Sequence, residues 1–238
     1  LGCKIVDCGG SGNNCMLLSA LTARDKLAGK NPPMEGYAAT AEELRQEILF
    51  LIHADLQNHV FYLEHRLTAI GLPVEEIATV VEKARSLSRR GVNPELDKKE
   101  IAELRAQLLP EIARWLRMDE GSGAVDDEWN DLTEAMGRIG DLSFLYEHST
   151  AGKSLYIETA GYLSQIFGRD IAIVAKSSRA SRVYYFRANG LHRGDLEGEL
   201  EDVIEKWKAR RAEDLNPIIL ELSGSGHSGH YRAFVPKD

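Results

Sequence analysis

The middle of the chain carries a long amphipathic helical pattern. Between residues 38 and 118, apolar side chains recur at steps of three and four, the spacing of one helix face. No strand pattern interrupts this stretch, so we expect 38–118 to form a helical insertion lobe within a larger domain. The first apolar run is Leu44, Ile48, Leu51, Ile52, Leu56, Val60, Leu63, Leu67 and Ile70.

Local signals predict where these helices begin and end. Thr40 and Glu43 have the spacing of a capping box, so the first long helix should begin there and end before the glycine and proline at 71 and 73. Two further helical patterns cover 74–87 and 101–116, and Pro110 should kink the second. Residues 119–128, DEGSGAVDDE, are acidic and contain glycine, which is typical of a surface loop.

The two ends of the chain have a different pattern. Residues 15–28 and 155–167 have helical spacing and are each followed by a glycine. Apolar runs predict strands at 170–176, 182–188, 217–223 and 230–236, and a charged helical pattern covers 196–213. We therefore expect a single α+β domain over 1–238. Its small central β-sheet should lie between helices, with the first helix and the last hairpin drawn from opposite ends of the chain.

Charge and cysteine content argue against several classes of function. The 238 residues include 29 Lys and Arg against 37 Asp and Glu, a net charge of -8 that disfavours nucleic-acid binding. No apolar run approaches the roughly 20 residues that span a bilayer, so we expect a soluble protein with no membrane partner. Cys3, Cys8 and Cys15 all lie near the start of the sequence, which indicates a reducing compartment such as the cytoplasm. An oxidised Cys3–Cys8 pair is the alternative.

A glycine-rich turn, GGSGNN, immediately precedes Cys15 and the first helix. A phosphate-binding loop would need a Gly-Lys-Ser/Thr ending or a GxGxxG within a βαβ unit, and the turn has neither. The first turn of a helix favours a reactive thiolate, so we expect Cys15 to be a nucleophile. The backbone N–H groups of Gly12, Asn13, Asn14 and Cys15 are the expected oxyanion donors. A buried structural cysteine is the alternative role for Cys15, and Cys8 is the rival nucleophile.

A thiol nucleophile needs a base, and histidine suits neutral pH. His53, His59 and His65 recur at six-residue steps, which spreads them around a helix. His230 instead begins the apolar strand HYRAFV after a glycine-serine turn, so we expect it to be the base, with His227 as the rival. The sequence contains neither HExxH nor a CxxC pair, so no metal or other cofactor is expected.

Three segments together resemble the ovarian tumour (OTU) family of cysteine deubiquitinases. GSGNNCMLLSAL is similar to the family's nucleophile segment, typically Asp-Gly-Asn-Cys before an apolar helix. LYIETAGYLSQIFGRDIAIVAKS is similar to its later helix and strand, and PIILELSGSGHSGHYRAFVP to its strand, loop and His-aromatic strand. The resemblance implies a papain-like OTU fold in which Cys15 and His230 cleave isopeptide bonds of ubiquitin or polyubiquitin.

The resemblance also implies how the substrate is selected. The helical insertion expected at 38–118 is similar to those of bacterial effector members of the family. In these members the extra helices supply a ubiquitin-binding lobe, and the proteins act in the host cytosol. Ubiquitin ends in Arg-Leu-Arg-Gly-Gly, so a narrow channel beside the cysteine and nearby carboxylates are expected. The acidic segments 119–128 and 195–205 are candidates for those carboxylates.

The sequence departs from the family motif at three positions. Gly12 stands where the family has aspartate, and Asn13 stands where it has glycine. Arg232, two residues after His230, stands where the family often has Asn or Asp, and arginine cannot accept the imidazole N–H. The catalytic pair therefore either lacks a third member or takes its acid from elsewhere. Asp7, at the end of the KIVD run, is the candidate, and its alternative role is to cap the glycine turn.

Two other functions remain open from the sequence. A catalytically inactive ubiquitin-binding module would share every fold signal, and the missing motif acid favours it. A papain-like cysteine protease or acyltransferase that acts on an unrelated substrate would share the nucleophile and the base.

Overall fold

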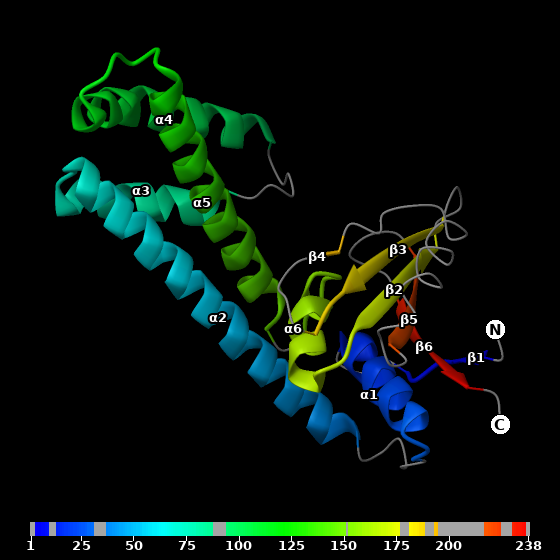
Figure 1. Ribbon diagram of the computed structural model, residues 1–238. Coiled ribbons are helices and arrows are strands. Elements are labelled where there is room, and N and C mark those ends of the chain that lie inside the picture. The colour runs from blue at the N-terminus through cyan, green and yellow to red at the C-terminus, as the bar shows by residue number, and fades with distance from the viewer. Residues whose placement is uncertain are drawn as a thin grey trace. The chain divides into compact units, whose positions relative to one another are not determined.

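The computed structural model describes residues 3–9, 13–30, 37–87, 94–150, 152–176, 181–188, 193–194, 217–224 and 230–236. The chain divides into two compact units, one made of 1–50 with 148–238 and the other of 51–147. The first unit contains a mixed sheet with helices, and the second is helical (Figure 1). Mixed α+β architecture is therefore confirmed at this level.

The first unit contains all the strands of the described chain. They are β1 (Cys3–Val6), β2 (Ile171–Lys176), β3 (Ser181–Phe186), β4 (Arg193–Gly194), β5 (Ile218–Ser223) and β6 (His230–Pro236). Its helices are α1 (Cys15–Leu27), α6 (Thr159–Phe167) and the first part of α2 (Tyr37–Ile70). The predicted helix at 196–213 lies outside the described residues.

The sheet brings the two ends of the chain together. Its strand order is β1-β6-β5-β2-β3-β4, so β1 is hydrogen-bonded to the last strand, β6. The pair is antiparallel, with Val6 opposite Ala233. Strands β2 and β5 are parallel to each other, and β6 runs back antiparallel to β5, so Ser223 at the end of β5 pairs with His230 at the start of β6.

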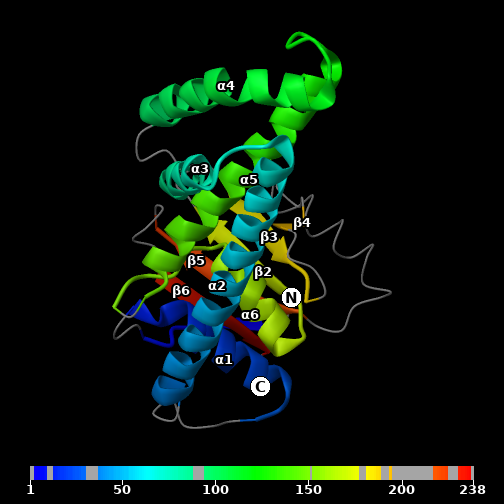
Figure 2. The ribbon, with the colours of Figure 1, turned by 90° about the vertical axis from the view of Figure 1, so that its left-hand side faces the viewer.

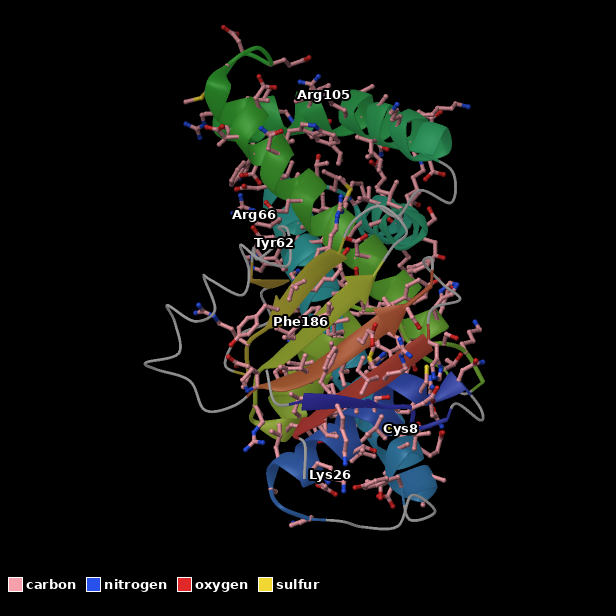
Figure 3. The ribbon with its side chains drawn as sticks, turned by 90° about the vertical axis from the view of Figure 1, so that its right-hand side faces the viewer. Cys8, Lys26, Tyr62, Arg66, Arg105 and Phe186 are labelled. Atoms are coloured by element: carbon pink, nitrogen blue, oxygen red, sulfur yellow. The ribbon has the colours of Figure 1, made fainter. Side chains whose placement is uncertain are left out.

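Helices α1 and α6 cover the same face of this sheet. The Ser19 hydroxyl of α1 donates to the Tyr231 carbonyl of β6 at 3.0 Å, and Gly161 of α6 lies beside the Phe186 ring of β3. The strand register places Tyr231 and Phe186 on one face. Figure 3 shows the sheet from the other side, with both helices behind the strands.

The two helices run in the same direction. Near their N-termini the Thr159 hydroxyl lies 3.4 Å from the Met16 sulfur, and near their C-termini the Arg24 guanidinium lies 5.0 Å from the Phe167 ring centroid. Helix α6 ends at Gly168, which has a φ of 57°, and the chain then enters β2. The N-terminus of α1 therefore lies toward the end of the sheet where β2 and β5 finish and β6 begins.

The helical unit consists of the remainder of α2 with α3 (Val74–Ser86), α4 (Pro94–Leu116) and α5 (Gly123–His148). Its core is built from the predicted apolar stripes, and Ile52, Leu63, Leu104 and Leu132 are fully buried. The end of α3 lies against α5 (Figure 2), where a Cβ added to Gly140 would lie 1.3 Å from the Leu87 carbonyl oxygen. Only glycine fits this contact.

The helical unit and the predicted helical lobe overlap but have different limits. The helical unit spans 51–147 instead of 38–118, and α2 begins at Tyr37, so Thr40 lies inside the helix and does not cap it. The predicted loop 119–128 also overlaps α5, which begins at Gly123. Val125, Trp129 and Leu132 bury a helical face there, and Asp126 in the first turn suits the helix dipole. No helix of the described chain is long and apolar enough to cross a bilayer.

Candidate functional site

Cys15 is the first residue of α1, as predicted, and its side chain is buried with 8% exposure. Asn14 precedes it as the N-cap residue, and its carbonyl accepts the Leu18 N–H at 2.9 Å. The carbonyl of the Asn14–Cys15 peptide therefore points along the helix. A trans peptide holds its C=O and N–H on opposite sides, so the Cys15 N–H points outward from the N-terminal end of the helix. Within the described residues, no side chain caps this N-terminus.

The turn before Cys15 is held by a residue that the sequence analysis missed. Arg45 of α2 is fully buried, and its guanidinium donates to the Asn14 side-chain oxygen from Nη2 at 2.6 Å and from Nε at 3.1 Å. Nη2 also donates to the Asn13 carbonyl at 3.1 Å. Asn13 itself has a φ of 61°, the left-handed conformation that glycine and asparagine tolerate best. Asparagine therefore satisfies the backbone requirement at the position where the family has glycine.

The same guanidinium binds a second turn. Nη1 donates to the carbonyl oxygens of Ser149, Thr150 and Lys153 at 2.9, 3.3 and 3.1 Å. The Asn13 side-chain amide donates to the Gly152 carbonyl at 2.6 Å. The turn at 13–14 and the turn at 149–153 are therefore joined directly and through Arg45.

His230 and Asp7 meet across 223 positions of sequence. The Nε2 atom of His230 lies 2.9 Å from Asp7 Oδ1, and the two side chains are 38% and 61% exposed. The hydrogen bond with His230 is the main cause that lowers the pKa of the Asp7 carboxyl below its usual value. Asp7 Oδ1 also accepts the Gly9 N–H at 3.0 Å. Both interpretations of Asp7, as the partner of His230 and as a cap of the glycine turn, thus correspond to contacts in the structure.

Arg232 is engaged elsewhere. Its guanidinium forms an ion pair with Glu221 of β5 at 3.1 Å, and Glu221 is 1% exposed. Arg232 and Glu221 lie directly opposite each other on neighbouring strands. The position that often carries the third catalytic residue in the family is therefore used here for a cross-strand ion pair.

Cys15 and His230 lie toward the same end of the sheet, but the structure does not join them. Cys15 lies one helical turn before Ser19 on α1. Ser19 contacts Tyr231, which is the residue next to His230. Tyr231, Ala233 and Val235 are buried beneath α1, so strand alternation directs the His230 side chain to the opposite face. Among the described residues, no hydrogen bond or ion pair links Cys15 with His230.

Tyr231 belongs to the immediate environment of Cys15. Burial raises the pKa of its phenol well above the usual value, and the charges of Cys15, Glu158 and Tyr184 act in the same direction. The burial of Tyr231 against α1 places β6 beneath the N-terminal half of that helix.

Cys8, the rival nucleophile, lies in a different environment from Cys15, and His227, the rival base, is not described. Cys8, labelled in Figure 3, is buried at 7% exposure, and its sulfur lies 3.3 Å from the Thr22 hydroxyl in the second half of α1. It is a free thiol, as is Cys15. Gly12, His227 and the 195–205 segment lie outside the described residues. No cluster of three or more His, Cys, Asp or Glu side chains that could hold a metal occurs in the part of the chain that is described.

Comparison of the chain with protein-family models, with curated proteins and with solved structures gives no match.

Proposed function

We propose that this protein is a cysteine hydrolase of the OTU type with a papain-like fold, and that it cleaves isopeptide bonds between ubiquitin and lysine side chains. The observation that carries the proposal is the Asp7–His230 hydrogen bond, located at the end of the sheet toward which α1 presents Cys15. Thiol hydrolysis requires a nucleophile, a base and a group that orients the base, and the Asp7–His230 pair would supply the last two once the imidazole turns toward Cys15. The choice of ubiquitin as substrate rests on the sequence resemblance.

In the proposed reaction, His230 removes the proton of the Cys15 thiol, and the thiolate attacks the carbonyl carbon of ubiquitin's last glycine. The negative charge on the tetrahedral oxygen is stabilised by backbone N–H groups of the turn, those of Asn14 and Cys15 above all. His230 then gives its proton to the departing lysine amine, which leaves a thioester on Cys15. Water, activated by the same imidazole, hydrolyses the thioester and restores the thiol.

Asp7 has a supporting role in this mechanism. Its carboxylate accepts a hydrogen bond from the imidazole and stabilises the imidazolium that forms when the thiol loses its proton. The imidazole must turn across the end of β6 to reach Cys15. Because 38% of the His230 side chain is exposed, solvent-side space is available for this rotation, and exposed side chains rotate in picoseconds to nanoseconds.

A ubiquitin derivative with an electrophile in place of its C-terminal carboxylate tests the proposal. We expect the wild-type chain to form one covalent adduct, Cys15→Ala to form none, and Cys8→Ala to react like the wild type, as a matched control. His230→Gln should slow adduct formation at least about hundredfold, the usual contribution of a general base. Absence of any adduct or binding would contradict the proposal and would favour an unrelated substrate.

One observation favours a second candidate, an inactive ubiquitin-binding module. The Cys15 side chain is nearly enclosed, and the His230 ring is bound to Asp7 instead of the thiol. For such a module, the same ubiquitin derivative would bind reversibly with no adduct, and Cys15→Ala would bind equally well.

A further inference from the structure

We infer that Arg45 is a positioning residue for Cys15, which keeps the N-terminus of α1 uncapped and supplies the positive charge that a thiolate there requires. This inference rests on the proposed role of Cys15 as the nucleophile. It concerns a residue of the helical pattern that neither the motif nor the resemblance singled out. Four observations carry it: the buried charge of Arg45, the hydrogen bonds that its guanidinium makes with Asn14, the orientation of the peptide before Asn14, and the charges around Cys15.

The first observation is that Arg45 has no buried counter-ion among the described residues. Its side chain is fully buried, and its hydrogen bonds all go to neutral oxygens, those of Asn13, Asn14, Ser149, Thr150 and Lys153. Within the described chain, no carboxylate lies at ion-pair distance from the guanidinium. A buried cation without a paired anion costs much free energy, so a negative charge that forms close to it is stabilised.

The second observation is that Asn14 does not cap the helix. Asparagine at an N-cap position ordinarily accepts the N–H of the second or third helical residue. Here its side-chain oxygen accepts two hydrogen bonds from Arg45 instead, and no side-chain cap bond forms. The first N–H groups of α1 therefore stay available to a negative charge at Cys15 or on the substrate carbonyl.

The third observation is the orientation of the preceding peptide. The Asn13 carbonyl accepts from Arg45 Nη2, so it points toward the guanidinium. In a trans peptide the N–H of the next residue points the opposite way, which turns the Asn14 N–H away from Arg45. The Asn14 and Cys15 N–H groups are free of acceptors among the described residues. Both are among the four donors that the sequence predicts for an oxyanion, the others being Gly12 and Asn13.

The fourth observation is the set of charges around the thiol. Burial lowers the pKa of the Arg45 guanidinium, and the carboxylate of Glu42 and the thiolate of Cys15 oppose this effect. This attraction is mutual, so the charge of Arg45 stabilises the Cys15 thiolate as well. Tyr231, whose phenol interacts with the charge of Cys15, brings no positive charge. Arg45 is thus a cation that the described residues place in electrostatic contact with Cys15.

The test is the rate at which chloroacetamide alkylates Cys15, measured by peptide mass spectrometry between pH 5 and pH 9. Asn14→Asp preserves the shape of the acceptor but places a carboxylate against Arg45. We expect the alkylation of Cys15 at pH 7 to slow about tenfold, with an unchanged or higher Tm. Gln46→Glu makes the same amide-to-acid change at an exposed position of α2 and should leave Cys15 unaffected.

Arg45→Gln gives an independent result because it removes the charge itself. We expect the same slowing of Cys15 alkylation at pH 7, and Cys8, alkylated in the same sample, should reveal any general opening of the fold. If Asn14→Asp and Arg45→Gln change only the Tm and leave the Cys15 profile at its wild-type position, Arg45 is merely structural and the inference is overturned. Alkylation requires no ubiquitin, so this outcome is distinct from a failure of the ubiquitin derivative to react.

Discussion

The Nε2 atom of His230 lies 2.9 Å from the Oδ1 atom of Asp7, although 223 positions of sequence separate the two residues. Pairing of β1 with β6 produces this contact, because it places the residue after β1 beside the first residues of the last strand. The acid that this chain lacks two residues after His230, where Arg232 stands, is thus available from the other end of the chain. In the proposed mechanism this arrangement replaces the usual residue two positions beyond the histidine.

The Asp7 carboxyl should titrate below its usual pKa of about 3.9, because the hydrogen bond with His230 stabilises its charged form. A carboxyl whose pKa is lowered by folding stabilises the fold above its unfolded pKa, and this contribution is lost as the pH falls through the lowered value. The exposed side chain makes the contribution small. Carbon-13 NMR of the Asp7 carboxyl measures the midpoint directly. In His230→Gln the midpoint should rise, and an identical midpoint in both proteins would contradict the pairing.

Asn13 should tolerate glycine but not valine. Its φ of 61° is accessible to asparagine and glycine, whereas a β-branched residue is strained there by about 1–3 kcal/mol. Asn13→Gly loses the side-chain bond to Gly152 but keeps the backbone conformation. Urea unfolding should therefore show a clearly larger loss of stability for Asn13→Val than for Asn13→Gly. Equal losses would mean that the turn has a different backbone conformation in solution.

Gly140 should be irreplaceable in the helical unit. A Cβ at this position would lie 1.3 Å from the Leu87 carbonyl oxygen, so α3 and α5 would have to separate. We expect Gly140→Ala to lower the free energy of unfolding by about 3 kcal/mol or more, the upper range for overpacking. Gly123→Ala is the control, because no atom lies within 4 Å of its added Cβ. It should be neutral or stabilising by up to about 1 kcal/mol. Equal stability of the two variants would refute the close contact.

Local pattern was sufficient for much of the fold. The apolar run at 230–236 predicted β6, and Gly168 predicted the end of α6. The start of α5 was missed because glycines and acids around residue 123 have the composition of a loop, whereas the burial of Trp129 and its neighbours outweighs that local preference.

The candidate site was predictable only in part. Cys15 and His230 are marked by their positions at the start of a helix and of a strand, and Asp7 by the end of β1. No local sequence pattern marks Arg45 as a residue of the site. Its acceptors lie about 30 and about 105 positions away in sequence, so only the tertiary structure reveals them. The direction of the His230 side chain also depends on register, which a sequence pattern does not specify at the first residue of a strand.

The central claim is that His230 activates Cys15, and the alkylation rate of Cys15 below pH 7 tests it most directly. A thiolate held by an imidazolium reacts at a pH where an isolated thiol is protonated. We predict that wild-type Cys15 reacts with chloroacetamide at pH 6 at least about tenfold faster than Cys15 in His230→Gln, while the reaction of Cys8 is the same in both proteins. Superimposable Cys15 rates in the two proteins from pH 5 to pH 9 would contradict the account.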